Sequence, residues 1–370
     1  MTSLTVPSAV LSRAQRVADA YTIFTGVDVD AGELIGGRAG LLGIAPRGRI
    51  SAGGATRLMP CRDGWCALTL SRDDDIDAVP ALLGAQRVAD EWRAVQTWAA
   101  GCDVADVTER ARLLGLPVAA LAETPAGPPR VYPFGAGTTT RAPAGLLVAD
   151  LSAMWAGPLC GHLLARAGAT VVKVESIARP DGARRGPRAF FDWLNAGKLS
   201  YTVDFDDPDS VRPLLEAADV VIESSRPAAL TRRLLGPTHI APRDGRVWLR
   251  ITGHGTDGER ADWVAFGDDA AVSGGLVRSA PENPTFCGDA IADPLTGLEA
   301  ALAVAQSLRS GGGELIELSM AAVAATYAEQ PDTGDTDCAT TPRITASAPE
   351  PGADNATVDE LISGRRFAPC

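Results

Sequence analysis

Between residues 146 and 319, short apolar segments alternate with segments that carry apolar residues at helical spacing. This alternation is typical of βαβ units, whose strands pair in parallel. The first unit has a strand at 146–152, a helix at 156–169 and a strand at 170–176. Pro158 falls in the first turn of that helix and Gly168 near its end, where helices favour these residues. We therefore predict an α/β fold.

Four further strands extend the predicted sheet to at least six, at 201–205, 219–224, 246–253 and 314–319. Helices are predicted at 208–218, from Pro227 onward, near 269–276 and at 294–310. No G-x-G-x-x-G follows the first strand, so the fingerprint of a dinucleotide site is missing. A Rossmann-like sheet in this chain therefore does not imply that the protein binds NAD.

The chain divides at a Pro/Gly-rich stretch near residue 128. We predict a small α+β domain at 1–128, a linker at 129–145 and a Rossmann-like domain at 146–328. Residues 329–355 are rich in Pro, Thr and Asp, so an extended tail with a short terminal helix is predicted at 329–370.

Composition excludes several classes of protein. A formal net charge of -12 argues against broad nucleic-acid binding, so an anionic ligand needs a local basic cluster. No apolar run reaches the roughly 20 residues of a membrane span, and we expect a cytoplasmic protein. Seven cysteines without a secretion signal indicate reduced thiols. Cys61 and Cys66 flank a predicted hairpin turn, and no Cys or His pair completes a zinc site, so no metal is predicted.

Five segments of the second half follow one another in the order of a known family. They are 148–176, 195–211, 219–236, 251–258 and 288–304. Together they resemble the family III CoA-transferases, the formyl-CoA:oxalate and carnitine CoA-transferase group, whose superfamily includes alpha-methylacyl-CoA racemase. The resemblance covers about residues 144–325 and implies that 146–328 is a CoA-binding domain.

Residues 45–70 and 98–121 resemble the small domain of the same family, which ordinarily follows the large one. Residues 348–362 still resemble the ordinary closing segment. The sequence therefore indicates a rearranged order, with the small domain placed N-terminally. Family members are interlocked dimers, so the resemblance implies a homodimer. Interlocking itself does not follow, because the rearranged order removes one covalent connection.

The resemblance implies that Asp293 is the nucleophile of an acyl-CoA:carboxylate CoA-transferase, an enzyme of acyl-CoA metabolism. Its carboxylate attacks the acyl-CoA to give a mixed anhydride and then an aspartyl-CoA thioester. Pro294 follows and a helix runs on from there, so Asp293 is predicted at the N-cap, where the helix dipole favours the ionised form. From position alone, the alternative is a simple helix cap.

The resemblance further implies contacts with a CoA thioester that is a substrate and not a permanently bound cofactor. The implied residues are Trp155, Ala156, Lys173, Ser224, Ser225, Arg226 and Arg232. The alternative for Trp155 is a core aromatic. Other basic candidates, Arg179, Arg184, Arg185, Arg188, Lys198 and Arg233, are otherwise surface or packing residues. Ser176, Asp206 and Ser224–Ser225 depart from the family pattern.

The racemase histidine of the superfamily corresponds to Asp268, so a simple racemase is disfavoured. His254 is interpreted as a surface or packing residue. Gly53–Gly54 matches either the family's glycine loop or an ordinary turn. Two alternative functions stay open: a CoA-thioester isomerase or racemase that uses Asp293 with another partner, and a CoA-binding paralogue without turnover. The sequence does not identify the acyl group.

Overall fold

A seven-stranded sheet forms the centre of the computed structural model, which describes residues 4–279, 282–330, 334–338 and 340–366. Its strand order is β5-β13-β10-β9-β6-β7-β8. The six parallel strands are β6 (Leu147–Asp150), β7 (Thr170–Ser176), β8 (Leu199–Val203), β9 (Val220–Glu223), β10 (Val247–Thr252) and β13 (Glu314–Ser319). The strand order reverses between β6 and β9, as in doubly wound sheets. The predicted α/β class and its six strands are confirmed.

The predicted linker contributes an additional strand. β5 (Arg130–Pro133) pairs antiparallel with β13 at the edge of the large sheet. Two prolines precede β5 and Pro133 ends it, which fits an edge strand because proline cannot donate to a second ladder. Residues 129–145 are therefore partly incorporated into the sheet.

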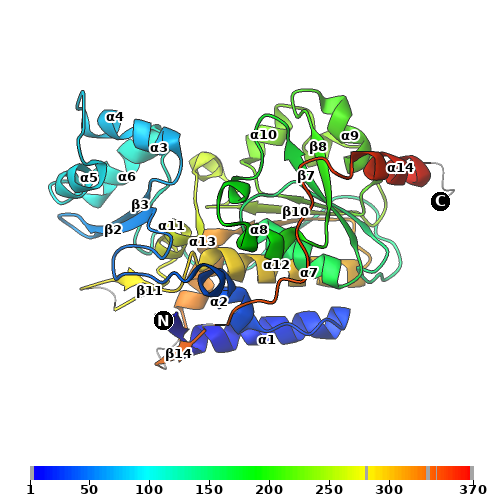
Figure 1. Ribbon diagram of the computed structural model, residues 1–370, viewed down its shortest axis with the longest axis horizontal. Coiled ribbons are helices and arrows are strands. Elements are labelled where there is room, and N and C mark those ends of the chain that lie inside the picture. The colour runs from blue at the N-terminus through cyan, green and yellow to red at the C-terminus, as the bar shows by residue number, and fades with distance from the viewer. Residues whose placement is uncertain (1–3, 280–281, 331–333, 339, 367–370) are drawn as a thin grey trace.

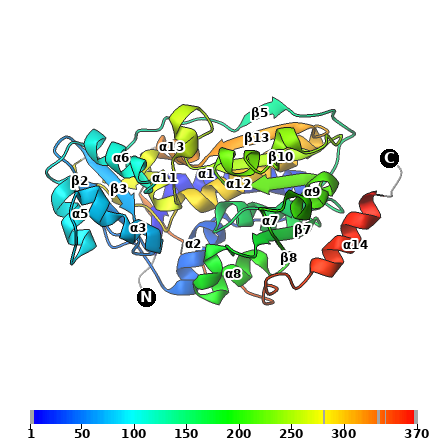
Figure 2. The same ribbon diagram turned by 90° about the horizontal axis from the view of Figure 1, so that it is seen from above.

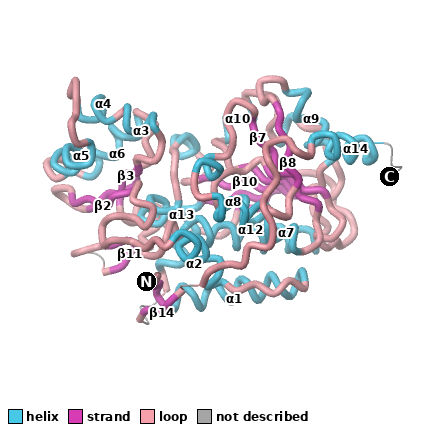
Figure 3. The backbone as a smooth tube through the Cα atoms, in the orientation of Figure 1, coloured by secondary structure: helices cyan, strands magenta, loops and turns pink. Residues whose placement is uncertain are grey.

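Helices cover both faces of the large sheet (Figure 1, Figure 3). One face packs against α7 (Ala156–Arg166), α8 (Arg188–Asn195), α12 (Ala292–Arg309) and α13 (Met320–Ala328). The other packs against α9 (Pro208–Ala217), α10 (Pro227–Thr231) and α14 (Asn355–Arg366), the predicted terminal helix. Shorter elements are η1 (Gly182–Arg185), η2 (Pro237–His239), η3 (Gly258–Asp262), α11 (Gly267–Ser273), β11 (Val277–Arg278) and β12 (Thr285–Phe286).

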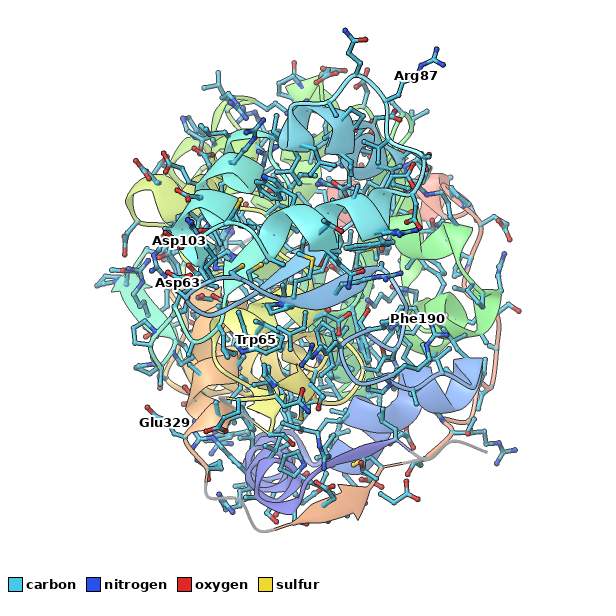
Figure 4. The ribbon with its side chains drawn as sticks, turned by 90° about the vertical axis from the view of Figure 1, so that its left-hand side faces the viewer. Asp63, Trp65, Arg87, Asp103, Phe190 and Glu329 are labelled. Carbon is cyan, nitrogen blue, oxygen red and sulfur yellow. The ribbon has the colours of Figure 1, made fainter. Side chains whose placement is uncertain are left out.

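A smaller unit with its own core lies at one end of the molecule (Figure 2). Its antiparallel strands are β2 (Thr56–Pro60), β3 (Trp65–Thr69) and β4 (Val118–Ala120), and its helices are α3 (Asp73–Asp77), α4 (Val79–Leu83), α5 (Glu91–Ala99) and α6 (Val104–Leu113). The predicted hairpin between Cys61 and Cys66 is present, and the two thiols are free, with their sulfurs 3.5 Å apart. Asp63 in its turn accepts the Val104 amide at 2.8 Å, which ties the hairpin to α6 (Figure 4).

The first two helices pack with the large sheet. Residues of α1 (Ser8–Thr25) and α2 (Ala31–Leu42) belong to the same hydrophobic core as α7 and α12. The Tyr21 hydroxyl donates to the Leu163 carbonyl at 2.8 Å. The division at residue 128 stays a prediction, and this packing favours a small domain that runs only from β2 to β4.

The tail after α13 returns to the N-terminal elements. β14 (Asp335–Asp337) pairs antiparallel with β1 (Thr5–Pro7). The segment after β14 then lies directly on α2, where a Cβ at Gly36 would come 1.7 Å from the Cys338 carbonyl oxygen. Glycine at 36 is therefore required for this close approach. Cys370 lies outside the described residues. Across the described ranges, no helix is both long enough and apolar enough to span a membrane.

Candidate active site

Asp293 lies where two helices begin. α12 starts at Ala292 with Ile291 as its N-cap, so the predicted N-cap position of Asp293 is wrong by two residues. The chain turns helical earlier than expected because Ile291 already has helical dihedrals and the Asp293 amide donates to the Ala290 carbonyl at 2.9 Å. The partly exposed Asp293 carboxylate accepts the amide N–H of Ala156, the first residue of α7. Two helix N-termini therefore favour negative charge at this side chain.

Close packing holds the Asp293 carboxylate in place. A Cβ at Gly267 would lie 2.3 Å from Asp293 Oδ2, so α11 approaches the carboxylate only because residue 267 is glycine. Two non-glycine residues with left-handed backbones precede the two helices, Met154 with φ of 70° and Ala290 with φ of 42°. Such strained residues concentrate at functional sites. The geometry is that of a preorganised site.

Two more carboxylates and one arginine surround Asp293. Arg38, from α2, donates through Nη1 to Asp289 Oδ1 at 2.5 Å. Its guanidinium lies 5.7 Å from the ring centroid of Trp155 and 5.4 Å from that of Phe190. Asp268, on α11, accepts the Ala290 amide at 3.0 Å. Within the described residues, no three His, Cys, Asp or Glu side chains are grouped to hold a metal ion.

Burial and mutual repulsion raise the pKa values of these acids. Burial and the charge of Asp268 raise the pKa of Asp293 to about 7, against the Ala156 N–H and Arg38. Burial and the charge of Asp289 raise the pKa of Asp268 to about 6. Burial also raises the pKa of Asp289, and Arg38 opposes the rise in all three cases. Near neutral pH the cluster therefore holds fewer than three negative charges.

The smaller unit supports this cluster from β2 and β3. The buried Asp269 accepts the Phe266 amide at 2.6 Å and the Thr69 hydroxyl at 3.0 Å. Thr69 shares a hydrogen bond of 2.9 Å with Thr56, whose hydroxyl lies 3.4 Å from Asp268 Oδ2. Burial raises the pKa of Asp269 to about 8. This chain of bonds fixes α11, and hence Asp268, against the small sheet.

The predicted CoA contacts at Ser224–Arg226 lie at the reversal of strand order. The Ser224 hydroxyl accepts the Ala153 amide at 3.2 Å, which joins the loops after β6 and β9. Ser225 Oγ is buried and has no hydrogen-bond partner among the described residues. Arg226 and Arg232 are exposed, and neither side chain has a hydrogen bond or ion pair to any described residue. Ligands of doubly wound sheets bind at this edge.

Two of the predicted CoA-contact residues, Trp155 and Lys173, are buried and have protein partners. Trp155 is only 2% exposed, and its ring packs edge-on against Phe190 and Trp193. Its ring therefore has the packing of a core aromatic, and it also lies beside the Arg38 guanidinium. Lys173 is also 2% exposed and pairs with Asp181 at 2.8 Å. Because that pair must break before the ammonium can reach a phosphate, the environment of Lys173 argues against direct CoA contact. Asp181 in turn accepts the Met154 amide at 3.0 Å, so the pair positions the loop before α7.

Most of the other basic candidates are already paired. The pairs are Arg184–Glu175, Arg188–Glu350, Lys198–Asp150 and Arg233–Asp206. Arg179 and Arg185 are exposed, and their side chains make no ion pair with the described residues. His254 is buried against Trp263 with its pKa lowered to about 3 by burial, which is the packing role expected.

Gly53–Gly54 forms a turn beside Arg38. The Gly54 amide donates to the Ser51 carbonyl at 2.9 Å, and a Cβ at Gly53 would lie 3.4 Å from Arg38 Nη2. The sequence interpretation missed Arg38 and Asp289. Asp289 stands near Asp293 in the 288–304 segment and was open to recognition, whereas nothing in the 31–42 segment marks Arg38.

The model of the family described as CoA-transferase family III matches residues 144–354. The chain belongs to this family. Among curated proteins, the chain is similar to succinyl-CoA--D-citramalate CoA-transferase of Chloroflexus aurantiacus, 31% identical over 47% of this chain and 48% of the relative. Human succinyl-CoA:glutarate CoA-transferase is 32% identical over 48% of this chain and 44% of its own length. The chain therefore spans about half the length of the curated relatives it matches.

Among solved structures, the hypothetical protein Rv3272 of Mycobacterium tuberculosis is 29% identical, with a TM-score of 0.46 over 51% of this chain and 57% of that chain. The range matched by the family model begins at residue 144 and leaves the smaller unit outside it.

Proposed function

We propose that the protein is an acyl-CoA:carboxylate CoA-transferase that works through an aspartyl-CoA thioester on Asp293. One observation carries the proposal: within the family-matched range, the Asp293 carboxylate is partly exposed, accepts the Ala156 N–H and sits at the start of both α7 and α12. A carboxylate nucleophile needs its ionised form. The two helix N-termini stabilise the ionised form of Asp293, although burial and neighbouring acids raise the pKa of this carboxyl group to about 7.

In the proposed reaction, a carboxylate oxygen of Asp293 attacks the thioester carbonyl carbon. The C–S bond breaks, CoA leaves as a thiolate, and a mixed anhydride remains. The thiolate then attacks the carbonyl carbon of Asp293 and expels the donor acid as its carboxylate. An acceptor carboxylate reverses these steps and frees Asp293. No proton is consumed overall, so the chain's task is to place and stabilise charge.

CoA is proposed to lie across the reversal point of the sheet as a substrate. Ser224, Ser225 and Arg226 follow β9 and the backbone at 155–156 follows β6 at that edge, while Arg232 ends α10 and Arg179 and Arg185 follow β7. Unpaired arginines suit the phosphate groups of CoA. Lys173 is proposed to position the β6–α7 loop and not to contact CoA directly.

The smaller unit is proposed to be the family's small domain in an N-terminal position, and the protein is proposed to form a homodimer. The small-domain proposal is supported by β2 and β3, which present Thr56 and Thr69 to the acids of α11.

One observation favours a second candidate, a CoA-thioester isomerase or racemase. The charge of Asp268 acts on Asp293, and both acids have raised pKa values, so the pair is suited to exchanging a proton next to a thioester carbonyl.

Intact-protein mass spectrometry after incubation with a panel of acyl-CoAs tests the proposal, with Asp293→Asn as the test variant and the exposed Asp262→Asn as the matched control. We expect a CoA-sized adduct that maps to Asp293, is absent from Asp293→Asn and is discharged by a carboxylic acid. If deuterium from the solvent is incorporated and no adduct forms, the isomerase proposal takes the place of the transferase proposal. CoA binding with neither result would indicate a paralogue without turnover.

A further inference from the structure

Arg38 comes to the site from outside the family-matched range. It stands on α2, whereas Asp268, Asp289 and Asp293 all lie within residues 144–354. We infer that Arg38 is the anion-binding group of this site: it receives the carboxylate of the acceptor acid, and the thioester oxygen that becomes negative when Asp293 attacks. The inference rests on the proposed transferase function.

Exposure separates the groups that can meet a substrate from those that support them. Asp293, Asp268 and Arg38 are partly exposed, and the Arg38 side chain retains 23% of its surface. Asp289 is fully buried behind them. A buried acid that pairs with a partly exposed arginine fixes its direction and leaves its remaining donors toward the open side. Asp289 is therefore an anchor, and Arg38 faces the substrate.

The guanidinium is held rigidly but is far from saturated. Its five N–H groups make one hydrogen bond to the described residues, from Nη1 to Asp289. The rings of Trp155 and Phe190 support it, and the Gly53 turn passes beside Nη2. Because the side chain is already ordered, binding an anion costs little further side-chain entropy.

Charge balance requires such a group. The acceptor is itself an anion, and it must approach a site built from three acids. Arg38 is the positive charge that opposes the raised pKa values of all three. In the aspartyl-CoA thioester, Asp293 carries no charge, so Arg38 then faces two acids in place of three. The acceptor carboxylate therefore enters at the stage when the site is least negative. Because Arg38 is the cation that acts on these acids among the described residues, the site suits acceptors whose reacting carboxylate is their only charge.

Steady-state kinetics with an acyl-CoA donor and a monocarboxylate acceptor test this role. Arg38→Gln should lower kcat/KM for the acceptor by about 100-fold, the usual loss of one preorganised donor at an oxyanion. Arg38→Lys should recover only part of this because lysine lacks the planar fork. Arg38→Gly should regain activity on addition of guanidinium ion. The matched control is Arg47→Gln, an exposed arginine near the same glycine turn, which should leave kcat/KM unchanged.

A second variant separates binding from folding. Arg38→Gln alone leaves Asp289 as an unpaired buried acid, whereas Arg38→Gln/Asp289→Asn removes both charges together. If the double variant melts near the wild-type temperature but keeps the loss in acceptor kcat/KM, Arg38 acts on the substrate. Acceptor kinetics within twofold of wild type in that variant would overturn the inference. Failure of the proposed function would look different, because wild-type protein itself would then form no adduct on Asp293.

Discussion

Replacing Asp268 with asparagine should move the pH dependence of Asp293 to lower pH. The charge of Asp268 is the main cause, after burial, of the raised pKa of Asp293. Asparagine removes that charge and still accepts the Ala290 amide, which now bonds to Asp268 Oδ1 at 3.0 Å. In the proposed mechanism only the ionised form of Asp293 attacks the thioester, so the rate of adduct formation should rise with pH through its pKa. Removal of a neighbouring negative charge lowers that pKa.

The expected shift is about one pH unit, equivalent to about 1.4 kcal/mol. From a starting pKa of about 7, the ionised fraction at pH 6.5 then rises from about one quarter to about three quarters. Adduct formation should therefore be about threefold faster at pH 6.5 and unchanged at pH 8.5, where both proteins are ionised. Below pH 6 the difference should narrow, because burial and Asp289 raise the pKa of Asp268 itself to about 6.

Single-turnover quench experiments between pH 5 and 9, read by intact-protein mass, measure this midpoint. Asp262→Asn serves as the control for a general change in charge. An unchanged midpoint, or one displaced to higher pH, would refute the electrostatic account of the site.

Three further changes give independent predictions. Lys173→Met should lower the free energy of unfolding in urea by about 3–5 kcal/mol, because it leaves Asp181 buried and unpaired. Lys173→Met/Asp181→Leu should recover much of this loss. Equal stability of the single and double variants would contradict this account. Arg226→Gln should weaken CoA binding by about fivefold and lower its salt dependence, as calorimetry at two salt concentrations would show. Gly36→Val should lower the melting temperature and expose the tail to protease, since any Cβ at 36 collides with Cys338; wild-type protection would count against the packing described.

The parallel strands were predictable because each is an apolar run bounded by turn residues, and burial on both faces demands that composition. Their order was not, because pairing between β6 and β9 joins segments with two other strands between them in the chain. β5 escaped prediction since an edge strand with exposed residues carries no apolar period.

The nucleophile candidate was found through its segment, yet its position in the helix was missed by two residues because no side chain caps α12. For Trp155 and Lys173, the position near the site was predictable but the direction of the side chain was not. The direction of each side chain depends on partners such as Phe190 and Asp181 that only the folded chain brings near.

The glycine face of α2 has a consequence for the order in which the chain folds during synthesis. α2 is made long before the residues near Cys338 that cover the surface around Gly36. β1 likewise waits for β14 to complete its pairing. We therefore expect a nascent chain stalled before residue 335 to keep this N-terminal face uncovered and open to protease or chaperone. Synthesis of the segment from β14 to Cys338 then acts as the step that closes the protein around the helix bearing Arg38.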